Sequence, residues 1–579
     1  MKMIEGKLNY DRKKKLYIMV TSIHFILTFI WERSILVLDN GYEELISIPI
    51  VESYISARSE FIIIYILSKV ICFALVAFLW YLLFYVIKKI EKKILIPIVL
   101  VFAIGLIIGI ITYPDNYMDD IDNYTNYLYA VRLIPTYWQH VFTGAFYAGC
   151  CMTFPHPVSI VVIQWSLFVS ALGYIMQKIN NCFGGKLYLL PLILLLLPDT
   201  FFIAYDPYRN NLYTILTVFY FSFLYFDIYK SNGALRGCQK VLYVITTALI
   251  ASWRAEGIIV GFAGVLLYII YIDIPKRAIK NKIIIVMCTL FACVLFNRIQ
   301  HIGEAKYYGS DYSIVNTANV LSEIFNNPNA NLSYENVDDD IEAINNIVSV
   351  EVLKEQGLNG LRSSNWSKGH KDFNQTLASE SEAENYMNAY YNIVVNNLRD
   401  YLNVQLNVFF SSLGMSGTQF EQYSFSGESS VSLTYFQYTQ WEKGQTELLA
   451  TCGTLSWQQS NVRQVCYTIT DTIRQTILLL FRESGLIQLL RVCSILFMLC
   501  ICIRELLIML DNFNKTKMFY FITSFFIILQ YIGIILFMPV AREPYFYPMQ
   551  YASFLIITCL ICEKVISSRE NKAKTGTNI

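Results

Sequence analysis

The sequence predicts an all-α polytopic membrane protein with about twelve transmembrane helices. Three observations support this class. Of the 579 residues, 55% are hydrophobic and only 15% are charged, and the mean hydropathy is +0.44. One soluble core cannot bury that much apolar surface. The apolar residues also form runs of about 15 to 25, the length of a membrane-spanning helix, and Lys and Arg gather at alternate ends of these runs.

A window of about 19 residues locates the candidate spans. Their centres lie near residues 26, 74, 103, 167, 195, 220, 246, 265, 290, 499, 528 and 557. If these spans alternate, every segment with clustered Lys and Arg falls on one side, which the positive-inside rule assigns to the cytoplasm. Both termini are then cytoplasmic, and the first span is expected to be an uncleaved anchor.

The spans and loops divide the chain into four parts. Residues 1–93 form an N-terminal two-span hairpin. Residues 94–297 form a transmembrane core whose first outer loop, 113–156, is acidic. Residues 298–487 form an extracytoplasmic domain between the ninth and tenth spans, and residues 488–579 form the last three spans and a cytoplasmic tail.

The extracytoplasmic domain is expected to be mainly helical. It is polar and acidic, with twenty Asp or Glu against ten Lys or Arg between residues 298 and 474. Three consecutive acids, Asp338 to Asp340, suit a helix N-terminus, and the apolar residues after them recur at helical spacing. Alternating apolar and polar residues from Val431 to Tyr435 predict a short hairpin near the end of the domain.

The seventh and eighth spans are short and meet at a charged tip. About twelve apolar residues precede Trp253, Arg254 and Glu256, which interrupt the run. Helices that stop inside a membrane protein are tolerated where the backbone lines a cavity.

A cluster of carboxylates follows the third span directly. The stretch from Tyr113 to Ala130 carries Asp115, Asp119, Asp120 and Asp122. Ionisable groups beside hydrocarbon are costly unless they are solvated, paired or used, so this cluster predicts a functional site. The alternative is a solvated, capped turn that leaves the helix, and Asp115 after Pro114 fits that alternative well.

Arginines at predicted outer helix ends are candidates for holding a phosphate. The planar guanidinium matches two phosphate oxygens at once. The candidates are Arg209, Arg254, Arg542 and Arg132. The alternative for each is an interfacial side chain that reaches toward lipid head groups, and Glu256 is a candidate ion-pair partner of Arg254.

This arrangement resembles the GT-C superfamily of glycosyltransferases that use polyprenyl-phosphate-linked sugars. Three features carry the resemblance between about residues 94 and 567: an acidic first outer loop, an R-x-E-G tip, and a late Arg and Pro motif before the last span. In this sequence they are Asp119, Asp120 and Asp122; Arg254, Glu256 and Gly257; and Arg542, Pro544 and Tyr545. Within the superfamily it is similar to bacterial multi-pass proteins, although an extra two-span hairpin comes before the span that leads into the loop, whereas the simplest members place the loop after the first span.

The resemblance implies transfer of a sugar to a cell-envelope glycan or glycolipid at the outer face of a bacterial plasma membrane. Such a transfer needs a base near the acceptor hydroxyl and stabilised charge on the departing phosphate. We expect Asp119 or Asp120 to be the base of an inverting reaction, with Asp122 orienting it. Asp120 and Asp122 are also candidates to hold Mg²⁺ or Mn²⁺. No other cofactor and no nucleic-acid partner is expected.

Two alternatives stay open on the sequence. A lipid-linked glycan flippase or other transporter also has about twelve spans with both termini inside. However, the spans here hold few ionisable groups and the two halves show no internal repeat. A polysaccharide polymerase also has many spans and a large outer loop, and would depend on arginines in its outer loops more than on an Asp pair.

Overall fold

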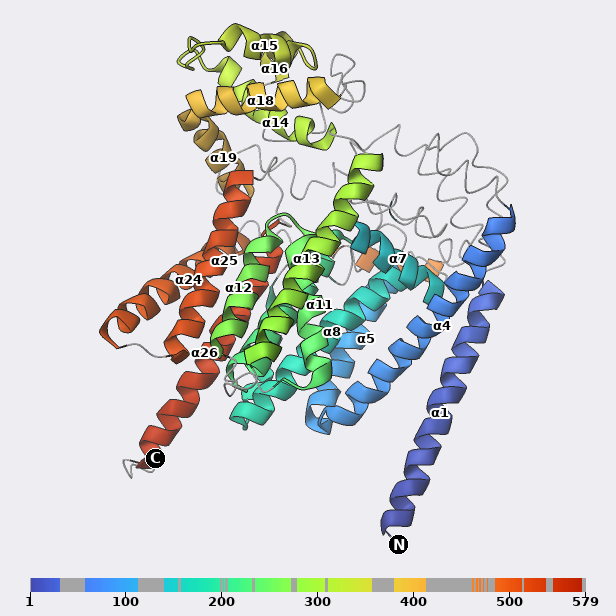
Figure 1. The fold of residues 1–579 in the computed structure, drawn as a ribbon. Coiled ribbons are helices and arrows are strands. Elements are labelled where there is room, and N and C mark those ends of the chain that lie inside the picture. The colour runs from blue at the N-terminus through green and yellow to red at the C-terminus, as the bar shows by residue number, and fades with distance from the viewer. Residues whose placement is uncertain are drawn as a thin grey trace. The chain divides into compact units, whose positions relative to one another are not determined.

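The computed structural model confirms an all-helical protein: every element in the part of the chain that it describes is a helix (Figure 1). The described residues are 2–31, 58–112, 126, 140–154, 158–197, 200, 203, 207–231, 235–271, 279–307, 311–356, 380–412, scattered positions between 461 and 476, 485–512, 515–537 and 545–574. The hairpin predicted around Val431 to Tyr435 lies outside these residues.

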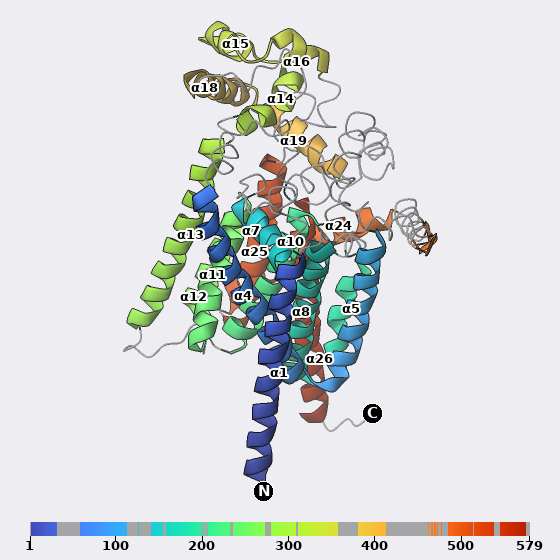
Figure 2. The ribbon, with the colours of Figure 1, turned by 90° about the vertical axis from the view of Figure 1, so that its right-hand side faces the viewer.

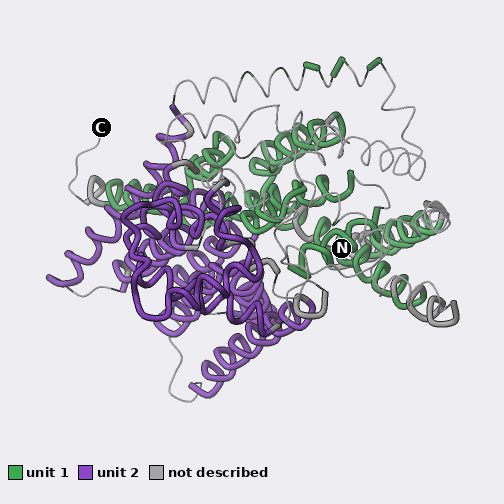
Figure 3. The backbone as a smooth tube through the Cα atoms, turned by 90° about the horizontal axis from the view of Figure 1, so that it is seen from above, with its two compact units in different colours: residues 1–215, 432–477, 558–579 green, residues 216–431, 478–557 purple. Residues whose placement is uncertain are grey.

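The chain divides into two compact units, shown in different colours in Figure 3. Unit 1 comprises residues 1–215, 432–477 and 558–579. Unit 2 comprises residues 216–431 and 478–557. Each unit is described by itself below.

Seven of the described helices are long and apolar enough to cross a membrane, which supports a polytopic integral membrane protein. They are Lys92–Ile111, Val158–Phe183, Arg209–Tyr229, Ile279–Gly303, Gln488–Asp511, Lys517–Leu536 and Tyr547–Glu570. These helices contain the predicted centres near residues 103, 167, 220, 290, 499, 528 and 557.

The other predicted centres also fall in helices. Those near residues 74, 195 and 265 lie in the shorter apolar helices Lys69–Phe84, Leu187–Leu196 and Gly257–Tyr271. The remaining two, near residues 26 and 246, lie in α1 (Lys2–Trp31) and α11 (Gly237–Trp253). The total of twelve spans and their orientation stay predictions.

Unit 1 is built around α8. Its helices are α1, α4 (Arg58–Lys89), α5 (Lys92–Thr112), α7 (Val141–Thr153), α8 (Val158–Phe183) and the 3₁₀ helix η3 (Leu187–Leu196). Helix α8 lies against α5, α7 and η3, and α4 lies against α1 and α7. The tight contact between α5 and α8 depends on Gly105, because a Cβ there would lie 2.0 Å from the indole of Trp165. That indole donates to the carbonyl oxygens of Val101 and Phe102, each at 3.2 Å.

Hydrogen bonds of His24 connect α1, α4 and α7 of unit 1. The indole of Trp80 donates to Nδ1 of His24 at 3.1 Å. Because Nδ1 accepts, the proton of the neutral ring is on Nε2, and Nε2 lies 2.8 Å from the carbonyl oxygen of Thr153. These bonds satisfy a buried polar side chain inside an apolar helix group.

The apolar part of unit 2 contains α11, α12 (Gly257–Tyr271), α13 (Ile279–Tyr307), α24 (Leu486–Asp511) and α25 (Lys515–Phe537). Helix α11 lies against α12 and α13, and α25 lies against α12 and α24. The structure shows the predicted interruption, because α11 ends at Trp253 and α12 begins at Gly257.

Helix α10 (Arg209–Phe223) begins in unit 1 and continues in unit 2 as a π-helix, η4 (Leu224–Tyr229). The amide of Lys230 donates to the carbonyl oxygen of Tyr225 at 2.9 Å, the five-residue spacing of a π-helix. The ring of Tyr229 stacks on Phe519 of α25 with centroids 4.5 Å apart. The π-helix is therefore held by aromatic packing inside unit 2.

Buried tyrosines fill the contact between α10, α11 and α12 within unit 2. The hydroxyl of Tyr220 donates to Oγ1 of Thr247 at 3.2 Å, and that of Tyr243 donates to the carbonyl oxygen of Gly264 at 3.1 Å. A Cβ at Gly264 would lie 1.6 Å from the Tyr220 hydroxyl, so only glycine allows this approach.

A second group of helices in unit 2 confirms the helical character predicted for the polar domain. It contains α14 (Asp311–Asn326), α15 (Val337–Asn345), α16 (Val350–Gln356), α18 (Glu380–Asn396) and α19 (Leu398–Ser412), and Figure 2 shows the first four close together. The acids Asp338 to Asp340 lie in the first turn of α15, as predicted. The last helix among the described residues is α26 (Tyr547–Lys574).

Buried Asp340 has a structural role in this domain. Its carboxylate accepts from the hydroxyl of Tyr334 at 2.8 Å and from the amide of Asn392 in α18 at 3.1 Å. These bonds connect α15 to α18 and satisfy the charge inside the domain.

Candidate functional site

The structure describes three of the predicted site residues: Arg209, Arg254 and Glu256. The others lie outside the described residues: Asp119, Asp120, Asp122, Arg132 and Arg542. Their roles stay predictions, as does a Mg²⁺ or Mn²⁺ site at Asp120 and Asp122. Within the described parts of the chain, no three His, Cys, Asp or Glu side chains lie close enough together to hold a metal ion.

One residue of the acidic stretch from Tyr113 to Ala130 is described, and it is fully buried. Asn126 has an exposed fraction of 0%. It follows Asp122 by four residues.

Buried side chains from two helices hold the segment that leads into Arg209. The hydroxyl of Tyr147 in α7 donates to the carbonyl oxygen of Pro207. The amide of Gln164 in α8 donates to the carbonyl oxygen of Ile203 at 2.8 Å. Both donors are 0% exposed. The fold of unit 1 therefore fixes the position of Arg209, the first residue of α10.

His140 caps the N-terminus of α7 with an unusual backbone. Its Nδ1 accepts from the amide of Phe142 at 3.3 Å, and its carbonyl oxygen accepts from the amide of Thr143 at 3.0 Å. Its φ is 81° and its ψ is 138°. A positive φ of this kind costs a non-glycine residue about 1–3 kcal/mol and is concentrated at functional sites.

Two N–H groups of His140 and Arg209 are buried without an acceptor among the described residues. Because Nδ1 of His140 accepts from a backbone amide, its proton is on Nε2. That Nε2 and the Nε of Arg209 both have no hydrogen-bond partner within the described structure. Buried donors are almost always satisfied, so this pair predicts a ligand that supplies acceptors.

The electrostatics of the pair favour an anion. Burial, and next the positive charge of Arg209, lower the pKa of His140 to about 3. His140 is therefore neutral near pH 7 and acts as a hydrogen-bond donor, whereas Arg209 supplies the positive charge. The first turn of α10 adds the positive end of a helix dipole. A phosphate oxygen fits this combination of donors and charge.

The lowered pKa of His140 has a consequence for stability. Below its ordinary pKa of 6.5 the unfolded chain takes up a proton that the folded protein does not take up until about 3. We therefore expect the free energy of unfolding to decrease as the pH is lowered through that window, by up to about 1.4 kcal/mol per pH unit. Between about pH 7 and about pH 5, the wild type is expected to lose about 2 kcal/mol more than the His140→Asn variant.

Unfolding of both proteins in detergent measures this difference. Equal losses on acidification would show that folded His140 takes up a proton as readily as the unfolded chain, and would remove the case for a neutral imidazole.

Arg254, at the tip between α11 and α12, is buried and already paired. Its side chain is 4% exposed, and its Nε donates to the carboxylate of Glu256, which is 16% exposed. Its guanidinium carbon lies 4.8 Å from the ring centroid of Tyr545 in the late motif. The sequence alternative in which Glu256 pairs with Arg254 is thus what the structure shows. A neutralised Arg254 attracts an anion less strongly than Arg209 does.

Sequence reasoning missed His140. A single His before an apolar run resembles an ordinary helix cap, and nothing local in the sequence signals its positive φ or its nearness to Arg209. Compared with known protein families, with curated proteins and with solved structures, the chain matches none.

Proposed function

We propose that this protein is an integral membrane glycosyltransferase. It transfers a sugar from a polyprenyl-phosphate-linked donor to a cell-envelope glycan or glycolipid on the extracytoplasmic side of a bacterial plasma membrane. The observation that best supports this function is the anion site of unit 1, where Nε2 of His140 and Nε of Arg209 are buried without an acceptor among the described residues.

In this proposal His140 and Arg209 hold the phosphate of the donor. As the bond between the anomeric carbon and the phosphate oxygen breaks, negative charge grows on the departing phosphate. Arg209 opposes that charge and His140 donates a hydrogen bond to it, and fixed donors that meet a growing charge lower the barrier. Because His140 stays neutral near pH 7, it does not compete with the acid loop for protons.

The acid loop supplies the base. The acceptor hydroxyl attacks the anomeric carbon on the face opposite the departing phosphate, so the anomeric configuration inverts as the bond to the phosphate oxygen breaks. The proton of the hydroxyl passes to Asp119 or Asp120. Asp122 orients that base, and Asp120 and Asp122 are the residues that would bind a divalent cation.

The remaining arginines have subordinate roles in this scheme. Arg254 is held by Glu256 and Tyr545 and keeps the tip between α11 and α12 in place. Arg132 and Arg542 are further candidates for the phosphate, on the strength of the sequence alone.

Transfer of labelled sugar tests the proposal. The full-length protein in nanodiscs is given extracted lipid-linked donors, and the wild type is compared with Asp119→Asn, Asp120→Asn and Asp122→Asn. Loss of the base is expected to slow transfer by about 10²- to 10⁴-fold. Asp115→Asn is the matched control, because it removes the same charge from the same loop at a residue that fits a capped turn. It is expected to keep its activity.

Two outcomes would contradict the proposal. In the first, all three variants turn over at the wild-type rate. In the second, the wild type consumes no donor but moves lipid-linked glycan across the bilayer, which would identify a flippase.

A further inference from the structure

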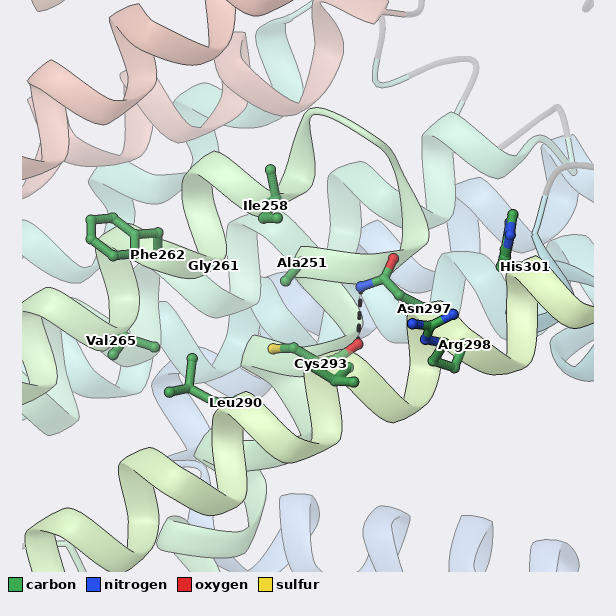
Figure 4. Close-up of a pocket in the computed structure, with 11 residues that line it drawn as sticks. Ala251, Ile258, Gly261, Phe262, Val265, Leu290, Cys293, Asn297, Arg298 and His301 are labelled. Carbon is green, nitrogen blue, oxygen red and sulfur yellow. Dashed lines mark hydrogen bonds between the residues drawn. The ribbon is translucent and has the colours of Figure 1, made fainter. Parts of the chain in front are cut away.

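Unit 2 contains an apolar groove between α12 and α13, with a volume of about 650 Å³ (Figure 4). This is within the range of pockets that bind small organic ligands. Its apolar lining comes from Ile258, Gly261, Phe262, Leu290, Cys293 and Val294.

Where Gly261 and Ala251 line the groove, α12 lies very close to α11. A Cβ at Gly261 would lie 2.6 Å from the Cβ of Ala251, so no side chain fills this position. The walls remain open, with Phe262 60% and Val294 59% exposed. Only 11% of the most apolar window of α13 is buried, which is expected of a helix that faces lipid. The groove therefore accommodates one hydrocarbon chain while staying in contact with the bilayer.

One end of the groove is cationic. Figure 4 shows Asn297, Arg298 and His301 at one end, and Val265 and Leu290 at the other. Arg298 and His301 are exposed and, three residues apart, share a face of α13. Neither has a hydrogen bond or an ion pair with the described residues. Both lie near the C-terminal end of the candidate span Ile279–Gly303, and the end of a membrane span is where lipid head groups are expected.

We infer that this groove binds an anionic phospholipid of the bilayer, with one acyl chain between α12 and α13 and the phosphate at Arg298 and His301. Charge complementarity supports the head group, because a cationic side chain at this level attracts acidic lipids. The open walls support a two-chain lipid, because the second chain can stay in the surrounding hydrocarbon. The inference does not depend on the proposed transferase activity.

The position of the groove gives the lipid a structural effect. Ala251 and Ile258, which line it, flank the tip that holds Arg254 and Glu256. A bound chain therefore supports both helices of the tip, and we expect it to raise the thermal stability of the protein, since a ligand that binds only the folded state stabilises it.

Native mass spectrometry of the delipidated full-length protein tests the inference, with phosphatidylglycerol and phosphatidylcholine as probes. The wild type is expected to bind phosphatidylglycerol about tenfold more tightly than phosphatidylcholine, and Arg298→Gln is expected to remove most of that preference. Val294→Trp is expected to weaken the binding of both lipids, because the indole fills the groove while Arg298 and His301 are unchanged. Lys280→Gln is the matched control, since it removes an exposed positive charge at the opposite end of α13.

Three results would overturn the inference. The wild type binds the two lipids equally, Arg298→Gln and Lys280→Gln have the same effect, or undecaprenyl phosphate displaces phosphatidylglycerol at equimolar concentration. The last would assign the groove to a single-chain isoprenoid. Because lipid binding is measured without turnover, a failed transferase assay leaves this test intact.

Discussion

The Arg209→Gln variant is expected to transfer sugar at least about a hundredfold more slowly than the wild type, because fixed donors that stabilise a departing oxyanion contribute effects of that size. Glutamine keeps much of the side-chain length and removes the charge. Tyr147 and Gln164 hold the backbone before Arg209 through their own hydrogen bonds, so the fold of unit 1 is expected to survive the change. Initial rates in nanodiscs, with matched protein yield and thermal unfolding, measure the effect.

Two further variants make this prediction specific. Arg209→Lys keeps the charge but loses the planar fork, so it is expected to recover only part of the rate. Arg569→Gln, which changes an exposed arginine of α26 in the same unit, is expected to be neutral. An Arg209→Gln variant that folds and turns over like the wild type would exclude the anion site from catalysis.

Substitution of His140 is expected to separate stability from activity. His140→Ala keeps the unfavourable positive φ and loses the helix cap, whereas His140→Gly loses the cap but adopts this φ without strain. The glycine variant is therefore expected to be about 1 kcal/mol more stable than the alanine variant. Both remove the imidazole, and both are expected to slow transfer by about tenfold to a hundredfold.

Asparagine at this position supplies the control. His140→Asn provides an acceptor for the amide of Phe142 and tolerates a positive φ better than most residues, so its stability is expected to approach that of the wild type while transfer stays impaired. If the alanine and glycine variants had the same free energy of unfolding, the positive φ of residue 140 would not strain the backbone. Full activity of the asparagine variant would contradict a role for Nε2.

Local patterns in the sequence were enough to predict much of the helical framework. Long apolar runs predicted about twelve spans, and seven of them coincide with described helices that are long and apolar enough to cross a membrane, because such helices are recognised by length and hydropathy. The break at Arg254 and Glu256 was also predictable, because charges after twelve apolar residues end a span. The ion pair of Arg254 and Glu256 was predictable as well, because the two residues are only two positions apart in the sequence.

The anion site and the lipid groove could not be predicted in this way. His140 and Arg209 are far apart in the chain, and the charge of Arg209 acts on His140 only because α7 and α8 position the segment before α10. The groove depends on the missing side chain of Gly261 against Ala251, a contact between separate helices. Such features depend on tertiary packing, which hydropathy does not encode. The acid loop stays a prediction from sequence, since Asp119, Asp120 and Asp122 lie outside the described residues.

The π-helix Leu224–Tyr229 limits how this chain can change in length during evolution. A π turn contains about one residue more than an α turn. Deleting a residue there would allow an ordinary α-helix but would rotate the two flanking segments by about 100° relative to each other. The ring of Tyr229 would then leave Phe519, and the order of side chains beyond it would change. Homologous sequences should therefore align across this segment without gaps, or should differ there in several aromatic positions at once.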